Sequence, residues 1–167
     1  YKMEKDFFNF ITITSYYPHK NLSILKKIIP ILRNNNIKCK FYLTIESTDF
    51  LQFEKFKDYI VNLGPVTIDE CPFLYDNADA LFLPTLLECF TASYPEAMKM
   101  EKPILTSDLS FSRNICKDSA IYFNPLDPED IVECINQIML NLTLRNNLIK
   151  NGNKRLKDFV DSKEKAK

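Results

Sequence analysis

The chain contains 167 residues, of which 46% are hydrophobic, and this is enough to bury the core of one domain of ordinary size. Its 22 basic and 22 acidic residues balance, which argues against a nucleic-acid binder that depends on bulk positive charge. The sequence has two glycines, Gly64 and Gly152, so glycine-rich GxGxxG and Walker-type phosphate loops are excluded by count.

Segments typical of strands alternate with segments typical of helices along the chain. Residues 7–14 are apolar and β-branched, as in a buried strand, and residues 21–35 follow with a helical spacing of apolar positions. Pro30 lies inside that helix and is expected to kink it or to end it early. The pattern then predicts strands at 38–45, 59–66, 79–84, 102–107 and 119–125, and helices at 50–58, 67–78, 94–100, 127–140 and 142–160.

This alternation predicts an α/β fold in which a parallel sheet of about six strands is covered by helices on both faces. We expect a single doubly wound, Rossmann-like domain over residues 1–160 and a solvated tail at residues 161–167. In a fold of this kind, ligands bind at the carboxyl ends of the strands.

Five cysteines are widely spaced and odd in number, and no Cys-x-x-Cys pair occurs: Cys39, Cys71, Cys89, Cys116 and Cys134. This pattern is typical of small core residues in a reducing compartment, and it predicts neither a metal site nor a redox pair. No apolar run approaches the ~20 residues that span a bilayer. We therefore expect a cytoplasmic protein and, because the chain begins with Tyr1, a piece of a longer one.

The junction after the predicted strand 79–84 reads PTLLECFTASYPE and contains two glutamates, Glu88 and Glu96. Ser93 precedes Glu96 by three residues, as in a capping box, and Pro95 suits the first turn of a helix. A helix that begins near Ser93 directs its free N–H groups toward the loop, where they favour an anion such as a phosphate. The hydroxyls of Thr91 and Ser93 add further donors.

Lys20 lies at the corresponding junction after the first predicted strand. A lysine at a helix start is unfavourable against the helix dipole, unless it neutralises a bound phosphate. Two such junctions on one sheet edge predict a diphosphate, and the carboxylates of Glu88 and Glu96 can each accept two hydroxyl hydrogen bonds. A nucleoside diphosphate sugar meets these requirements together. Taken alone, each of the three residues also has an ordinary structural explanation. Lys20 could be an exposed surface lysine, Glu88 a solvated loop charge, and Glu96 the capping-box partner of Ser93.

Several segments together resemble the C-terminal, donor-binding domain of retaining GT-B glycosyltransferases of family 4 (group 1), in particular the bacterial surface-polysaccharide type. They are YYPHKNLSIL, LGPV, YDNADALFLPTLLE, PTLLECFTASYPEAMKMEKPILTSD and AIYFNPLDPEDI, and the resemblance covers about residues 7–155. It implies half of an enzyme that transfers a sugar from a nucleoside diphosphate sugar to a saccharide or lipid-linked acceptor, with no metal, no other cofactor and no nucleic acid. The missing N-terminal domain would bind the acceptor. We expect the domain to be inactive alone, and the full-length protein to associate with the inner face of the membrane.

The resemblance also implies roles for individual residues. Lys20 holds the donor diphosphate, Glu88 is the catalytic residue that orients the donor sugar, and Glu96 holds the ribose hydroxyls. The further donor contacts implied are Cys89, Phe90, Thr91 and Ser93 around the sugar and phosphates, and Thr67 and Ile68 beside the base.

The sequence departs from the family pattern at two places. Cys89 and Thr91 stand where the family usually has glycines, and no arginine precedes Lys20 in its loop, which leaves phosphate binding to depend on Arg113 or Lys102. Two alternatives therefore stay open. One is a non-catalytic module that binds a nucleotide or a partner, and the other is a different GT-B enzyme, such as a sugar-nucleotide epimerase or a phosphorylase.

Overall fold

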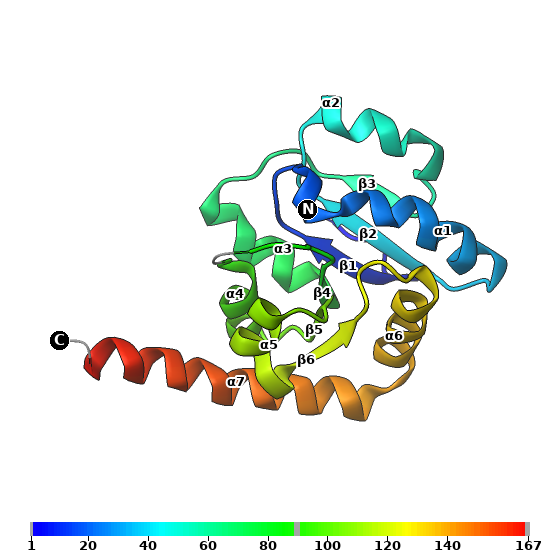
Figure 1. Ribbon diagram of the computed structural model, residues 1–167. Coiled ribbons are helices and arrows are strands. Elements are labelled where there is room, and N and C mark those ends of the chain that lie inside the picture. Colours follow the sequence, from blue (N-terminus) through cyan, green and yellow to red (C-terminus); the bar gives the residue numbers. More distant parts are fainter. Residues whose placement is uncertain (1, 89–90, 166–167) are drawn as a thin grey trace.

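The computed structural model describes residues 2–88 and 91–165, with side chains as far as Phe159. These residues form one α/β domain around a six-stranded sheet in the order β3-β2-β1-β4-β5-β6, and every neighbouring pair of strands is parallel (Figure 1). The strands are β1 (Phe8–Thr12), β2 (Cys39–Leu43), β3 (Ile60–Asn62), β4 (Ala80–Leu83), β5 (Ile104–Ser107) and β6 (Ala120–Phe123). The predicted fold class is confirmed.

Helices cover both faces of the sheet (Figure 1). The strands are apolar on both sides because each face of the sheet packs against its own apolar cluster. Phe10, Phe41 and Phe82 pack under one set of helices. Ile11 and Leu81 pack under the other set. The first set is α1 (Leu25–Asn34) and α6 (Pro128–Leu140), and the second is α3 (Cys71–Asn77), α4 (Ser93–Lys99), α5 (Ser110–Cys116) and α7 (Leu142–Lys165). No helix in the described part of the chain is both long and apolar enough to cross a membrane.

Buried hydroxyls on the central strands are bonded to the neighbouring strand. Thr12 Oγ1 donates to the Phe82 carbonyl at 2.6 Å, and Thr106 Oγ1 donates to the Leu83 carbonyl at 2.9 Å. Thr106 Oγ1 also lies 2.8 Å from the hydroxyl of Tyr94 on α4, so it joins the sheet to that helix. The next residue, Ser107, is fully buried, but its Oγ has no hydrogen-bond partner within the described structure.

The structure differs from the sequence prediction at several helices. α1 continues through Pro30 to Asn34, and since Pro30 is exposed, the carbonyl that loses its N–H partner lies on the solvent side of the helix. The predicted helix at 50–58 is instead α2 (Ser47–Phe50) followed by a 3₁₀ segment, Leu51–Phe56. α5 was not predicted, because it is short and, unlike α4, has neither a proline in its first turn nor a Ser-x-x-Glu pattern to mark its start. α7 continues to Lys165, beyond the predicted helix end at residue 160.

The long helix α7 packs across α4 and α5 and connects them. A Cβ atom at Gly152 of α7 would lie 3.2 Å from Met98 Cγ on α4, so the absence of a side chain there allows the two helices to approach closely. Arg155 Nε donates to the Ile115 carbonyl of α5 at 2.8 Å. These contacts fix α4, which follows the candidate loop, against the rest of the domain.

Candidate functional site

The strand order reverses between β1 and β4, which pair side by side through Phe10 with Ala80 and Ile11 with Leu81. The chain leaves these two strands in opposite directions, and in folds of this kind ligands bind near such a switch point, at the carboxyl ends of the strands. Lys20 lies in the loop after β1, within a 3₁₀ turn, Pro18–Lys20, and Glu88 lies in the loop after β4. The topology therefore places both residues at the switch point of the fold.

Lys20 and Glu88 are in direct contact at this point. The Lys20 ammonium forms a hydrogen-bonded ion pair with Glu88 Oε1 across 68 residues of sequence. The two side chains are only 16% and 8% exposed, so the pair is largely shielded from water. An ion pair in such surroundings interacts more strongly than one on an open surface.

The two loops are also joined through their backbones. The Leu86 N–H donates to the His19 carbonyl at 2.7 Å, and Thr85 Oγ1 lies 3.1 Å from the same oxygen. Asn21 Nδ2 donates to the carbonyls of Pro84 at 3.2 Å and Pro125 at 3.0 Å, which adds the loop after β6. The Lys20–Glu88 pair therefore lies at a junction of three loops.

The expected capping box at the start of α4 is wrong. Ser93 is buried inside the first helical turn, and its N–H donates to Thr91 Oγ1 at 3.3 Å. The N–H of Glu96 bonds to the Ala92 carbonyl at 2.9 Å, which places the helix start one residue earlier than the box requires. The carboxylate of Glu96 is directed elsewhere and accepts a hydrogen bond from the Tyr75 hydroxyl of α3 at 3.3 Å.

Glu96 lines a cavity of about 220 Å³ between α3 and α4. Ile68 lies on the same cavity and is 85% exposed, so the structure brings together two residues that were predicted to contact the ribose and the base. The other lining residues are Cys71, Pro72, Tyr75, Lys99 and Met100. Burial raises the pKa of the Tyr75 hydroxyl, and the nearby Glu96 charge raises it further, so Tyr75 remains a hydrogen-bond donor.

Thr67 lies next to this cavity but forms a local cap. The Thr67 N–H donates to Glu70 Oε2 at 2.8 Å, and Thr67 Oγ1 lies 2.9 Å from the same atom. Cys71 Sγ donates to the Thr67 carbonyl at 3.4 Å, and burial raises the pKa of this thiol. Cys89 and Phe90 lie outside the described residues.

The two cations considered as substitutes for the absent loop arginine lie elsewhere. Arg113 makes a two-point pair with Asp108, with Nε–Oδ1 and Nη2–Oδ2 distances of 2.6 and 2.8 Å, and its guanidinium covers the Tyr122 ring at 4.0 Å. The hydrogen bond from Arg113 lowers the pKa of Asp108. Lys102 precedes β5, at the opposite edge of the sheet, and donates to the Asp76 carbonyl at 3.2 Å. Neither residue joins Lys20.

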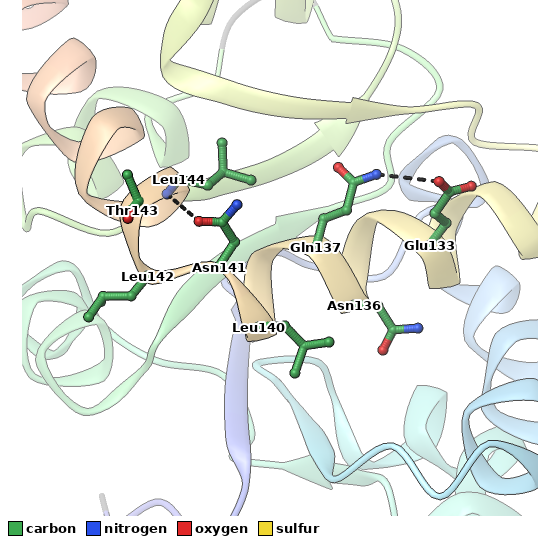
Figure 2. Close-up of a pocket in the computed structure, with 8 residues that line it drawn as sticks. All are labelled: Glu133, Asn136, Gln137, Leu140, Asn141, Leu142, Thr143 and Leu144. Atoms are coloured by element: carbon green, nitrogen blue, oxygen red, sulfur yellow. Dashed lines mark hydrogen bonds between the residues drawn. The ribbon is translucent and has the colours of Figure 1, made fainter.

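A second hollow, of about 600 Å³, lies at the turn between α6 and α7 (Figure 2). Leu140 and Leu142 are 83% and 60% exposed there, and Asn141 Oδ1 accepts a hydrogen bond from the Leu144 N–H at 2.9 Å at the start of α7. Glu133, Asn136, Gln137 and Thr143 complete the lining. Because α6 begins after the carboxyl end of β6 and runs back along the sheet, this turn lies at the edge opposite Lys20.

Sequence reasoning missed Asn21, Tyr75 and Thr85, which hold the predicted residues in place. One sequence signal could have pointed to Asn21. Asparagine adopts left-handed backbone more readily than most residues with side chains, so an asparagine in a loop that has no glycine marks a possible sharp turn. Tyr75 and Thr85 gave no signal, because their hydrogen bonds depend on segments far apart in the sequence.

Three solved structures share the fold of this chain. Sucrose-phosphate synthase (tll1590) from Thermosynechococcus elongatus superimposes with a TM-score of 0.80 at 16% identity, covering 93% of this chain and 42% of that one. TarM superimposes with a TM-score of 0.76 at 14% identity, covering 93% and 33%. A second TarM structure, a point mutant of the S. aureus protein in complex with fondaparinux, α-GlcNAc-glycerol and UDP, matches with a TM-score of 0.76 at 14% identity, covering 93% and 34%.

Sequence comparison identifies the family. The O-antigen chain mannosyltransferase RfbU of Salmonella typhimurium (strain LT2) is 28% identical over 141 residues, which are 82% of this chain and 40% of that protein. The chain thus spans about two fifths of the length of this relative. The sequence model described as "Glycosyl transferases group 1" matches residues 2–155. The chain therefore belongs to the group 1 glycosyltransferase family.

Proposed function

We propose that this chain is the donor-binding domain of a retaining glycosyltransferase that moves a sugar from a nucleoside diphosphate sugar to a saccharide or lipid-linked acceptor. The single observation that carries the proposal is the shielded Lys20–Glu88 pair at the switch point between β1 and β4. Another part of the full-length protein would supply the acceptor domain, which is consistent with a chain that spans 40% of its relative. Neither a metal nor another cofactor is part of this proposal.

Lys20 is proposed to bind the donor diphosphate. Its ammonium has three N–H donors, so it can keep one on Glu88 and direct the others at phosphate oxygens. When the bond between sugar and phosphate breaks, negative charge develops on the leaving diphosphate, and a positioned cation in a shielded site stabilises that charge. The hydroxyl of Thr91 and the region around Ser93, Cys89 and Phe90 would lie along the same phosphates and sugar.

Glu88 is proposed to contact the donor sugar as the catalytic residue. The contact with Lys20 through Oε1 leaves lone pairs on both carboxylate oxygens that can accept hydrogen bonds from sugar hydroxyls. Such contacts hold the sugar in a reactive orientation, which lowers the barrier by reducing the freedom of the reacting groups.

The cavity beside α4 is proposed to receive the nucleoside. Glu96 Oε1 and the unshared lone pairs of Oε2 would accept the ribose hydroxyls, while Ile68 and the adjacent Thr67 would lie against the base. The hydrogen bond from the Tyr75 hydroxyl to Glu96 Oε2 would keep this carboxylate in place.

The acceptor class is proposed from the relatives. An O-antigen chain mannosyltransferase is a surface-polysaccharide enzyme by name, and we propose the same kind of product here. We also propose that the full-length protein works in the cytoplasm at the inner face of the membrane, a location supported by the unpaired thiols of Cys39, Cys71, Cys116 and Cys134.

A non-catalytic module that binds a nucleotide or a partner is the second candidate. It is favoured by Cys89 and Thr91 in place of the usual glycines, since side chains there narrow the approach of a ligand to the backbone. Such a module would have the same fold but would not catalyse the transfer of a sugar.

Titration calorimetry with UDP, GDP, their mannose and N-acetylglucosamine derivatives, and the free nucleosides tests the proposal. We expect one of the two diphosphate series to bind, and Lys20→Ala to weaken the diphosphate by about tenfold or more while it changes nucleoside affinity much less. Lys27→Ala, at an exposed position on α1, is the matched control. If no nucleotide releases or absorbs heat, the donor-site proposal fails. Equal losses for diphosphate and nucleoside would contradict the role given to Lys20.

A further inference from the structure

Two side chains to which no role has been assigned so far connect the loops that carry Lys20 and Glu88. Asn21 Nδ2 donates to the carbonyls of Pro84 and Pro125 at 3.2 and 3.0 Å. Thr85 Oγ1 lies 3.1 Å from the His19 carbonyl and 3.2 Å from the Leu87 carbonyl. The single Thr85 O–H proton is shared between these two carbonyls. We refer to Asn21 and Thr85, with these four contacts, as the loop clamp.

Each member of the loop clamp suits its position. Asn21 has a φ of 55° and a ψ of 27°, in the left-handed region that asparagine tolerates and most residues avoid. Glycine would also fit that backbone, but it would lack the two N–H donors that Asn21 directs at two carbonyls. Thr85 is fully buried, so removing its hydroxyl would leave its two carbonyl neighbours with fewer hydrogen bonds in a shielded place.

The loop clamp fixes the backbone on both sides of the ion pair. Asn21 directly follows Lys20, and the Leu87 carbonyl that faces Thr85 directly precedes the N–H of Glu88. Lysine and glutamate side chains have many rotamers, so they meet reliably only when their backbones are held at the right separation. The His19 carbonyl, one residue before Lys20, faces both Thr85 Oγ1 and the Leu86 N–H.

We propose that Asn21 and Thr85 are positioning residues that set the Lys20–Glu88 contact and, through it, the geometry of the donor site. The catalytic consequence rests on the proposed function. The positioning itself is a property of the free protein and can be measured without any nucleotide.

The first test measures how strongly Lys20 and Glu88 depend on each other for stability. Unfolding of the wild type, Lys20→Met, Glu88→Gln and the double variant gives the coupling between the two residues. We expect a coupling of about tenfold in the unfolding equilibrium constant, which falls to less than about threefold when all four proteins also carry Thr85→Val. Thr85→Ser keeps the hydroxyl and should restore the coupling. Undiminished coupling in the Thr85→Val background would overturn the proposal.

A second variant covers the case in which Thr85→Val does not fold. Asn21→Asp keeps a residue that tolerates left-handed backbone but removes both N–H donors, and we expect it to reduce the coupling in the same way. Asn36→Asp makes the same chemical change at an exposed asparagine that also has a φ of 55°, so it is the matched control. Equal coupling in these two variants would also count against the proposal.

The kinetic test applies to the full-length enzyme. With Thr85→Val we expect kcat to fall by about tenfold to a hundredfold while the KM for the donor changes little, because the nucleoside cavity is not altered. Thr85→Ser should recover most of kcat. If the wild type binds no nucleotide, the proposed function fails while the coupling result stands, so the two failures can be told apart. A loss confined to KM, or no rescue by serine, would show that the clamp only supports the fold.

Discussion

Neutralising Glu88 should tighten the binding of a nucleoside diphosphate that carries no sugar. In this structure the Glu88 carboxylate contacts the Lys20 ammonium, and the two side chains are 8% and 16% exposed. A diphosphate on the same ammonium would place its nearest charged oxygen about 5 Å from the carboxylate oxygen, because each oxygen lies about 2.8 Å from the nitrogen and two N–H bonds diverge at about the tetrahedral angle. At an effective dielectric constant of about 20, two unit charges at that distance repel by about 3 kcal/mol.

The repulsion that can be recovered is smaller than this, since the diphosphate remains partly hydrated and screened by salt. We expect Glu88→Gln to recover about 1–2 kcal/mol of this repulsion, which corresponds to a gain of roughly tenfold in affinity for UDP or GDP. The reasoning depends only on the shared contact with Lys20, so the free nucleosides should bind Glu88→Gln and the wild type equally well.

Calorimetry on the wild type, Glu88→Gln and a control, Glu129→Gln at an exposed position on α6, measures this directly. Repeating the titration at higher salt should reduce the gain, since ions screen charges that are only partly shielded. A diphosphate affinity that stays the same or falls in Glu88→Gln would refute the reasoning. An equal gain for nucleosides would do so as well, because it would show that the carboxylate does not act on the phosphates.

The remaining predictions concern stability. Thr106→Val should lower the free energy of unfolding by about 1–3 kcal/mol, because it removes two buried hydrogen bonds. Ser107→Ala at the next position should be neutral or stabilising, because the Ser107 hydroxyl has no hydrogen-bond partner within the described structure. Urea denaturation of the two variants and the wild type measures both effects. Gly152→Leu should cost about 1–3 kcal/mol by forcing α7 away from Met98, whereas Lys154→Leu at an exposed position of the same helix should change little. Burial raises the pKa of the Cys39 and Cys116 thiols from 9.0 to about 12, so the folded state binds their protons more tightly than the unfolded state does. This contribution is complete below about pH 9 and is lost as the pH rises toward 12, so the melting temperature should fall over that range and less steeply in Cys116→Ala; a flat alkaline profile would contradict the burial of these thiols.

Much of the fold could be predicted from local pattern. The strands are short apolar runs because both faces of the sheet are covered, and a topological rule then places the ends of β1 and β4 side by side. Lys20 and Glu88 could therefore be expected to meet, although 68 residues separate them.

What could not be predicted depends on contacts between distant segments. The Ser-x-x-Glu pattern at Ser93 is a local signal for a capping box, but the Glu96 carboxylate is directed at Tyr75, which lies on another helix. Helix α5 is short and has no start signal of the kind that marks α4. The Asn21 bonds connect three loops that are separate in the sequence. Local propensity carries no information about such partners.

The scarcity of glycine has a consequence for ligand binding. Gly64 and Gly152 are the chain's two glycines, and several sharp turns with positive φ are made by residues with side chains, including Asn21. Such residues restrict the backbone of the unfolded chain, so less conformational entropy is lost when these loops become ordered. A loop junction that is already rigid is preorganised for its ligand, and the binding of a donor should then show a small entropic penalty rather than the large one typical of a loop that folds around its substrate.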